Sequence, residues 1–269
     1  MHRLSLEETK EIQLEILSDI QRYCNEHNLT WWLDFGTLIG AVRHKGYIPW
    51  DDDIDIGMYH DDFDEFVKGY NQSTSRYRVE TSLTNPNHPW SFAKVYDMNT
   101  IMYEPDENGY KFHVHVDVFI YDKAPKSDEE FVRFKKKVHT FQLLQANQTR
   151  AFRPNGPLPR RLLAYIIRVF LQLFPRGYFG RRLDIIRRKY NDSDTGRIVG
   201  YSSTDKPMEE NLMLTTEMAQ FEQYEFPVPV GYAEHIMKRY GFPYYELPPV
   251  EKRVRTHDFS AYSIEGGEK

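Results

Sequence analysis

Hydrophobic residues recur every three or four positions near the start of the chain, at Leu6, Ile12, Ile16, Ile20 and Tyr23. This spacing places one apolar face along a helix. Ser5 and Glu8 match a capping box, in which two side chains satisfy backbone N–H groups at the helix start. The pattern predicts a helix over residues 5–27.

The hydrophobic period changes to two between residues 53 and 56. Successive side chains of a strand point to opposite faces. Asp53 and Asp55 therefore share one face of a predicted strand, while Ile54 and Ile56 point into a core.

Short elements are predicted on both sides of this strand. Residues 31–35 are aromatic and typical of a strand, and Gly36-Thr37 should turn into a short helix over residues 38–42. Residues 61–70 are typical of another helix, with acids in the first turn, where the helix dipole favours negative charge.

Residues 76–120 are typical of β-structure, with candidate strands at 77–81, 91–96, 100–103 and 113–120. In the last strand one face carries Val114, Val116 and Val118, and the other carries His113, His115, Asp117 and Phe119. We therefore expect Asp117 on the polar face of a strand.

The second half of the chain predicts helices over residues 127–151, 162–174, 180–190 and 231–240, followed by a Pro-rich stretch. Apart from the helix over residues 231–240, the C-terminal third shows no clear pattern of helices or strands. We expect an α+β protein with a mixed β-sheet and helices in its core and a mainly helical second half.

The net charge of −5 conceals a basic segment. Residues 150–189 contain eleven Lys or Arg and one acid, Asp184. Such a patch is typical of contact with a polyanion, such as phospholipid headgroups, nucleic acid or a pyrophosphate. We favour the anionic inner face of a membrane and expect no nucleic-acid partner, because no nucleic-acid-binding module is recognisable.

Residues 162–174 are almost purely apolar but too few to cross a bilayer. Two interpretations remain open, a buried core helix and a helix lying in the membrane interface. Because the first ten residues are charged and polar, we expect no secretory signal and a cytoplasmic protein, peripheral on the membrane. Cys24 is the only cysteine, so no intrachain disulfide or cysteine zinc cage is expected.

Asp51, Asp52, Asp53 and Asp55 crowd four acids into five residues. Mutual repulsion and apolar neighbours make such charges costly unless a cation lies between them. With Asp117 on a neighbouring strand, Asp53 and Asp55 predict a site for Mg²⁺, or for Mn²⁺ in its place. The acids and the preceding Gly-Thr turn form the minimal active site of a nucleotidyltransferase fold.

A calcium-binding loop is the alternative interpretation of the same acids. Asp51, Asp53 and Asp55 match positions one, three and five of an EF-hand. Position six, normally Gly, is Ile56, and position twelve is Asp62 instead of Glu. This mismatch favours the magnesium interpretation.

Residues 35–58 have the sequence FGTLIGAVRHKGYIPWDDDIDIGM. This run resembles the signature of the LicD family of phosphocholine transferases, which is related to fukutin and fukutin-related protein. Residues 115–119 are similar to the family's second acidic strand. Its C-terminal motif is similar to Tyr240-Gly241, Leu247-Pro248-Pro249, Lys252, Arg253 and His257.

The resemblance implies transfer of phosphocholine from CDP-choline to a sugar hydroxyl with release of CMP. The implied acceptor is an N-acetylgalactosamine of a lipid-linked teichoic acid precursor. Another CDP-linked alcohol such as CDP-ribitol, a nucleotidylyltransferase reaction, and a non-catalytic calcium site are the alternatives. Residues 1–124 would form the catalytic core, 125–200 a basic helical segment that could face a membrane, and 201–269 would complete the active site.

These arguments assign candidate roles to individual residues. We expect Asp53 and Asp55 to hold the metal, and Asp117 to complete its site or take the proton of the sugar hydroxyl. The expected substrate contacts are Gly36 and Thr37 at the pyrophosphate, Arg43, Lys45 and Lys94 at the CMP phosphate, His257 at the substrate, and Trp50 at the choline ammonium. For Lys94 a solvent-exposed strand end, for His257 a structural position and for Trp50 a core position remain alternatives.

Overall fold

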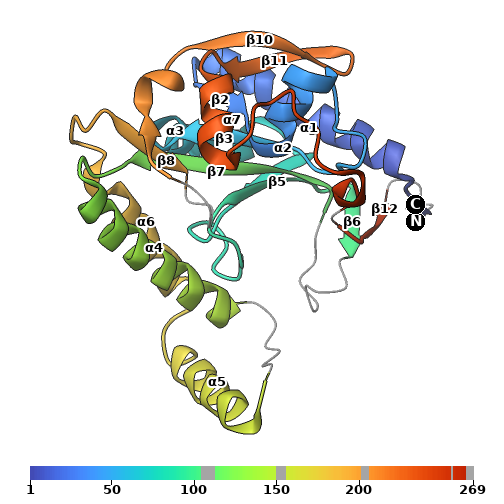
Figure 1. The fold of residues 1–269 in the computed structure, drawn as a ribbon. Helices are drawn as coiled ribbons and strands as arrows, with labels where there is room; N and C mark the ends of the chain where they lie inside the picture. The colour runs from blue at the N-terminus through green and yellow to red at the C-terminus, as the bar shows by residue number, and fades with distance from the viewer. Residues whose placement is uncertain (104–112, 150–155, 201–205, 256, 265–269) are drawn as a thin grey trace.

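The computed structural model describes residues 1–103, 113–149, 156–200, 206–255 and 257–264 (Figure 1). Its centre is a seven-stranded mixed sheet. The path runs β2 (Trp31–Leu33), β3 (Asp55–Tyr59), β7 (His115–Lys123), β5 (Ala93–Asp97) and β4 (Tyr77–Glu80). The end of β7 also pairs with β8 (Arg197–Gly200), which pairs with β9 (Met208–Glu209). The α+β prediction is confirmed.

Two helices, α1 (Leu6–His27) and α3 (His60–Ser73), pack against this sheet. The Ser5–Glu8 capping box is present, as predicted. Along β7 the burial alternates, with Val116 and Val118 in the core and Asp117 on the other face. The period of two is therefore confirmed, and it turns the acid away from the core.

A second sheet joins the two ends of the chain. It pairs β12 (Ser260–Ser263) with β1 (His2–Arg3) and β6 (Thr100–Tyr103), all antiparallel. The N-terminal strand β1 thus lies beside β12 (Figure 1). The pairing fixes the segment just before β12, which contains His257.

The C-terminal third is more ordered than the sequence predicts. A hairpin forms from β10 (Thr216–Phe221) and β11 (Tyr224–Pro229), followed by α7 (Tyr232–Tyr240) and the short η4 (Val250–Lys252). Two prolines in β11 weaken its strand signal, because proline cannot donate a ladder hydrogen bond. The backbone N–H of Glu222, in the hairpin turn, donates to the Lys45 carbonyl (2.8 Å), which joins the hairpin to the segment before the acids.

The predicted turn at residues 36–37 is already helical. The helix α2 (Phe35–Ile39) begins one residue before this predicted turn and continues into a π-helix, η1 (Gly40–His44). Asp34 caps it by accepting the Phe35 N–H at 2.8 Å. Phe35 adopts a left-handed backbone with φ 46°, a conformation that non-glycine residues rarely hold. The strained residue thus stands directly before Gly36 and Thr37.

Three helices extend from the sheet at the lower left of Figure 1. The pair α4 (Asp128–Thr149) and α6 (Tyr178–Arg187) buries Phe131, Phe134 and Leu183 between them, and η2 (Arg188–Tyr190) follows α6. The third, α5 (Leu158–Leu171), lies at the far end of α4. Most of its apolar side chains are exposed, so the buried-core interpretation is wrong for α5. Residues 150–155 of the predicted basic segment lie outside the described residues.

Candidate active site

The strands β3 and β7 place Asp55 directly beside Asp117. The two residues are register partners in a parallel pair, and Asp117 N–H donates to the Ile54 carbonyl at 2.9 Å. Asp53 lies just before β3, which begins at Asp55 instead of at Asp53. Because a strand occupies Asp55–Tyr59, the acids do not form the helix-flanked loop of an EF-hand.

Burial and mutual repulsion raise the pKa values of Asp53 and Asp55 in this site. Burial, followed by the charges of Asp51 and Asp117, raises the pKa of Asp53 to about 8. Burial and the charges of Asp53 and Asp117 raise the pKa of Asp55 well above its usual range. Negative charge crowded at a partly buried site favours binding of a hard cation. Carboxylates such as those of Asp53 and Asp55 suit a divalent cation, and their role as its ligands stays a prediction.

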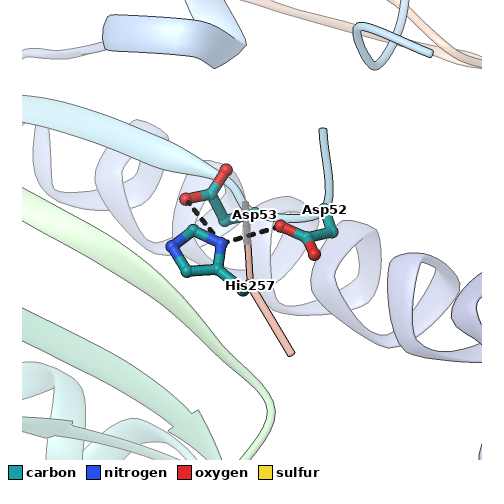
Figure 2. Close-up of side chains that lie close together, drawn as sticks. All are labelled: Asp52, Asp53 and His257. Carbon is teal, nitrogen blue, oxygen red and sulfur yellow. Dashed lines mark hydrogen bonds and ion pairs between the residues drawn. The ribbon is translucent and has the colours of Figure 1, made fainter. Parts of the chain in front are cut away.

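Asp52 and His257 form a second part of the acidic site (Figure 2). The buried Asp52 carboxylate lies 2.8 Å from His257 Nδ1, and Asp53 Oδ2 lies 4.0 Å from the same nitrogen. Donor atoms of the three residues lie within 4.8 Å of one another, which is compatible with a shared metal ion. Among the described residues, the structure thus adds Asp52 to the predicted acids and brings His257 to them.

Asp52 also anchors the C-terminal segment. Its Oδ2 lies 2.5 Å from Arg255 Nε. Burial alone would raise the pKa of Asp52, but His257 and Arg255 outweigh it and lower the pKa. Asp52 is therefore held as an anion by two residues more than 200 positions away in the sequence.

Lys94 pairs with Asp117 across the β5–β7 pair. Lys94 Nζ donates to Asp117 Oδ1 at 2.6 Å and to His115 Nε2 at 2.8 Å. Burial and the nearby Lys94 charge lower the pKa of His115 to about 4, so its imidazole is neutral and can accept. The lysine side chain is only 6% exposed, and the solvent-exposed alternative is wrong.

These residues line a pocket of about 260 Å³. Its lining includes Asp53, Lys94, His115, Asp117 and His257, with aromatic walls from Trp90, Phe92 and Phe259. A larger hollow of about 460 Å³ lies between α4 and α6, and none of the acids of the site lines it. The chemistry therefore points to the smaller pocket.

Gly36 and Thr37 support the acidic loop from α2. A Cβ on Gly36 would lie 2.5 Å from Asp51 Oδ2, so only glycine allows this close approach. Thr37 is buried, and its Oγ1 accepts the backbone N–H of Asp55 at 2.9 Å. Both residues thus fix the position of acids, and their contact with a pyrophosphate stays a prediction.

Five predicted substrate residues lie outside the lining of this pocket, namely Gly36 and Thr37, described above, and Arg43, Lys45 and Trp50. Arg43 donates to the carbonyls of Tyr244 (3.3 Å) and Glu246 (2.7 Å), which ties η1 to the C-terminal segment. Lys45 is exposed and ends η1 in a left-handed conformation. Trp50 is half-buried, and the guanidinium carbon of Arg253 lies 5.6 Å from its ring centroid. Their present contacts are structural, and their substrate roles remain predictions.

A buried ion pair joins α7 to the start of α2. Asp34 Oδ1 lies 2.8 Å from Arg239 Nη1 and 3.2 Å from His235 Nε2. Burial opposes ionisation of Asp34, but Arg239 and His235 hold its pKa below the usual range. The Asp34 N–H also donates to the Asp55 carbonyl at 2.9 Å. This network connects the C-terminal helix to the first residue of the acidic strand.

Sequence reasoning missed Asp52, His115 and the aromatic walls of the pocket. Asp52 lies within the acidic run, and His115 lies two residues before Asp117. Their closeness in sequence to predicted site residues was the feature that could have identified them. Trp90, Phe92 and Phe259 carry no such signal, because an aromatic residue is more often part of a core. Their position on the pocket depends on the tertiary structure.

Known proteins resemble this chain over much of its length. A family model described as "LicD/FKTN/FKRP, nucleotidyltransferase domain" matches residues 28–155. The lipopolysaccharide cholinephosphotransferase LicD of Haemophilus influenzae is 31% identical over 276 residues, covering 98% of this chain and 100% of that protein. The chain belongs to the LicD family. The LicD match also covers residues 125–200, for which the sequence showed no family motif.

A second group of relatives shares a shorter region with this LicD-family chain. The ribitol 5-phosphate transferase FKRP of Mus musculus is 32% identical over 89 residues, or 33% of this chain and 16% of FKRP. The human FKRP matches over the same length at 29% identity. The similarity to FKRP is therefore regional, whereas the similarity to LicD spans both chains.

Proposed function

We propose that this protein transfers phosphocholine from CDP-choline to a sugar hydroxyl and releases CMP. The main support is the full-length similarity to a cholinephosphotransferase, together with an acidic pocket that also has aromatic walls. We assign the core, residues 1–124, to the nucleotidyltransferase fold. Residues 125–200 would be a basic helical segment, and residues 201–269 would complete the active site through His257.

Asp53 and Asp55 would hold Mg²⁺, or Mn²⁺ in its place, and Asp117 would complete the set. Bound there, the metal would neutralise charge on the transferred phosphoryl group and align the in-line attack. Donor atoms of Asp52 and His257 lie close to Asp53 and could contact the same metal ion. The alternative role of Asp117 is to accept the sugar hydroxyl proton, and its position on β7 suits either role.

Lys94 would position Asp117 and present positive charge to the phosphates. Its ammonium already touches Asp117 and His115 inside the pocket. Gly36 and Thr37 would act at the pyrophosphate through α2, and Arg43 and Lys45 would act beside the leaving CMP. Developing negative charge is best stabilised by groups that are held in place before the reaction.

The aromatic walls of the pocket suit the choline group. Quaternary ammonium ions bind over aromatic faces by cation–π attraction. The Lys94 Nζ atom lies 4.9 Å from the Trp90 ring centroid and 5.2 Å from that of Phe92, so one cation already faces these rings, and choline would bind over the aromatic surface that Lys94 leaves open. We therefore assign choline recognition to Trp90, Phe92 and Phe259, and Trp50 remains a candidate outside the pocket lining.

The acceptor would be a lipid-linked glycan. The family resemblance implies an N-acetylgalactosamine of a teichoic acid precursor, and the name of the Haemophilus influenzae relative indicates lipopolysaccharide. Both acceptors are glycans with free sugar hydroxyls. We place the enzyme in the cytoplasm, peripheral on the inner face of the membrane, where such a lipid-linked acceptor is presented.

CMP release from CDP-choline tests this proposal. Purified protein with acceptor glycan should release CMP only when Mg²⁺ or Mn²⁺ is present. Asp53→Asn should abolish the release, and Asp61→Asn, an exposed acid on α3, should not. Equal CMP release by wild type and Asp53→Asn would overturn the acidic-site assignment. CMP found attached to the acceptor would instead identify a nucleotidylyltransferase.

Transfer of ribitol phosphate is the second candidate function. The regional similarity to FKRP favours it. Competition between CDP-choline and CDP-ribitol in the same assay separates the two donors. We expect CDP-choline to be preferred, because the pocket offers aromatic faces that ribitol does not require. Calcium binding without affinity for either donor would indicate the non-catalytic alternative.

A further inference from the structure

The helix α5 turns its apolar face outward. The exposed apolar side chains on and just after it are Leu158, Leu162, Leu163, Tyr165, Ile166, Ile167, Val169, Phe170 and Leu173. At about 100° per residue these side chains cover an arc of roughly 200°. A surface helix of a globular protein normally turns this stripe toward its core. The apolar face of α5 therefore points toward solvent instead of toward the core.

The opposite, narrower face of α5 packs against α4. Leu171 on this face is 2% exposed. The Gln148 side chain of α4 donates to the Leu171 carbonyl at 3.1 Å, and Gln172 Nε2 donates to the Gln148 carbonyl at 3.2 Å. Arg168 donates to the Asn147 carbonyl. These contacts hold α5 in one orientation on α4. The exposure of its apolar face to solvent therefore results from the packing of the two helices.

Basic side chains surround this apolar face. Described residues 156–189 contain nine Lys or Arg and one acid, Asp184, but two of the nine do not contribute to this surface, because Arg187 is buried against Asp122 and Arg188 pairs with Asp64. Asp184 is already paired with His60 (3.1 Å) and with Arg188 (2.9 Å). Among the arginines, Arg160 and Arg161 begin α5, and Arg181 and Arg182 lie exposed on α6. The surface therefore combines exposed apolar area with net positive charge.

We propose that α5 docks on the surface of an anionic phospholipid bilayer, with its axis in the membrane plane. Its apolar face would enter the boundary between headgroups and acyl chains, and its arginines would meet lipid phosphates. The 14-residue helix is about 21 Å long, which is shorter than the ~30 Å hydrocarbon core. No helix in the described part of the chain is long and apolar enough to cross a bilayer.

Charge distinguishes this partner from a second copy of the chain. Pairing α5 with itself would bring two groups of arginines together, and like charges at close range oppose association. An anionic membrane offers both an apolar layer and the complementary charge. Figure 1 shows α5 at the end of the molecule farthest from the β10–β11 hairpin, where it can reach a flat surface. The docking deepens the proposed membrane location and does not require the transfer reaction.

Vesicle flotation of the full-length protein tests the proposal. We expect at least tenfold tighter binding to phosphatidylcholine vesicles that contain 30% phosphatidylglycerol than to phosphatidylcholine alone, and weakening with salt. Ile166→Asn with Phe170→Asn should reduce this binding at least tenfold. The matched control is Val132→Asn with Val250→Asn, at two exposed apolar residues elsewhere. Circular dichroism should show that both double variants stay folded.

A labelled cysteine measures insertion directly. Cys24 is buried, so an environment-sensitive fluorophore should react selectively at Phe170→Cys or, as a control, at Val132→Cys. The emission should shift to the blue on anionic vesicles only for the label at position 170. Equal binding to neutral and anionic vesicles, or no shift at position 170, would overturn the proposal.

Two further outcomes separate this inference from its alternatives. A dimer in light scattering that Ile166→Asn with Phe170→Asn dissociates would show that α5 binds a second copy, and would overturn membrane docking. CMP release with a soluble acceptor tests the proposed function independently. Normal CMP release without vesicle binding would refute the docking alone, and vesicle binding without CMP release would refute the function alone.

Discussion

Lys94 and Asp117 form an ion pair at 2.6 Å between neighbouring strands of the central sheet. The two residues are antiparallel register partners on β5 and β7, so the sheet itself sets their separation. On the other side of β7, Asp117 is the register partner of Asp55. Asp117 thus stands between a cation and an acid, which is a suitable position for a residue that organises phosphate chemistry.

Replacing Lys94 should affect stability and activity together. Lys94→Met leaves Asp117 without its buried partner, and breaking such a pair costs about 3 kcal/mol or more. Urea unfolding should show this loss, and CMP release should fall by roughly 100-fold, or about 3 kcal/mol in the barrier. Adding Asp117→Asn should recover part of the stability but no activity. Wild-type CMP release by Lys94→Met would contradict the role of Lys94.

Asp53→Asn should lose activity while becoming slightly more stable. Burial and neighbouring acids raise the pKa of Asp53 to about 8, which means that its charge is unfavourable in the folded protein. A third of the side chain remains exposed, so solvent screening limits the expected gain to about 1 kcal/mol. Thermal unfolding without metal measures this gain.

Titration with Mg²⁺ completes the Asp53 test. A ligand that binds only the folded state raises the melting temperature. The wild type and the control Asp61→Asn should both show this rise, and Asp53→Asn should show little. An unchanged Mg²⁺ response in Asp53→Asn would remove Asp53 from the metal site.

Gly36→Ala should separate function from stability. The new methyl group would push against the Asp51 carboxylate, which is the flexible end of a side chain, so the fold can adjust. We expect a change in unfolding free energy below about 1 kcal/mol, because alanine also favours a helix. CMP release should still fall several-fold, since the acids shift.

Gly57→Ala is the contrasting substitution. Its methyl group would clash with the indole of Trp32, a rigid and fully buried ring. Overpacking of this kind costs about 1–3 kcal/mol. Chemical denaturation of both variants should therefore rank Gly57→Ala clearly below Gly36→Ala, and the reverse order would contradict the close packing of Gly57 on β3 against Trp32 on β2.

Stability should decrease in mild acid through His88. Burial lowers the pKa of His88 to about 4, whereas an unfolded histidine titrates near 6.5. Between these values the unfolded chain binds more protons than the folded chain, so stability is lost as the pH falls. The loss attributable to His88 should reach about 3 kcal/mol below pH 4.

Urea unfolding between pH 7 and pH 4 measures this dependence. His88→Gln should reduce the slope of the pH profile without removing it, because His115, whose pKa is also lowered to about 4, contributes in the same range. His139→Gln, at an exposed position on α4, serves as the control and should keep the wild-type slope. The same slope in His88→Gln and wild type would show that another group titrates.

The sequence alone determined the elements that depend on local order. The capping box and helical spacing predict α1, and the alternation of acids with Ile54 and Ile56 predicts the strand that carries Asp55. The valines of β7 place Asp117 on the opposite face for the same reason. The resemblance over residues 35–58 likewise indicates the LicD family from consecutive residues alone. These signals act over a few residues, so they do not depend on how the chain packs.

Only the tertiary structure decided which distant residues meet. His257 reaches Asp52 across 205 positions because β12 pairs with β6, and no local pattern specifies that pairing. The partnership of Lys94 with Asp117 depends on sheet register, and the aromatic walls depend on the loops that enclose the pocket. For α5 the same apolar sequence suits a buried or an exposed helix. Its exposure was decided by α4, which packs against its narrow polar face and leaves the wide apolar face outward.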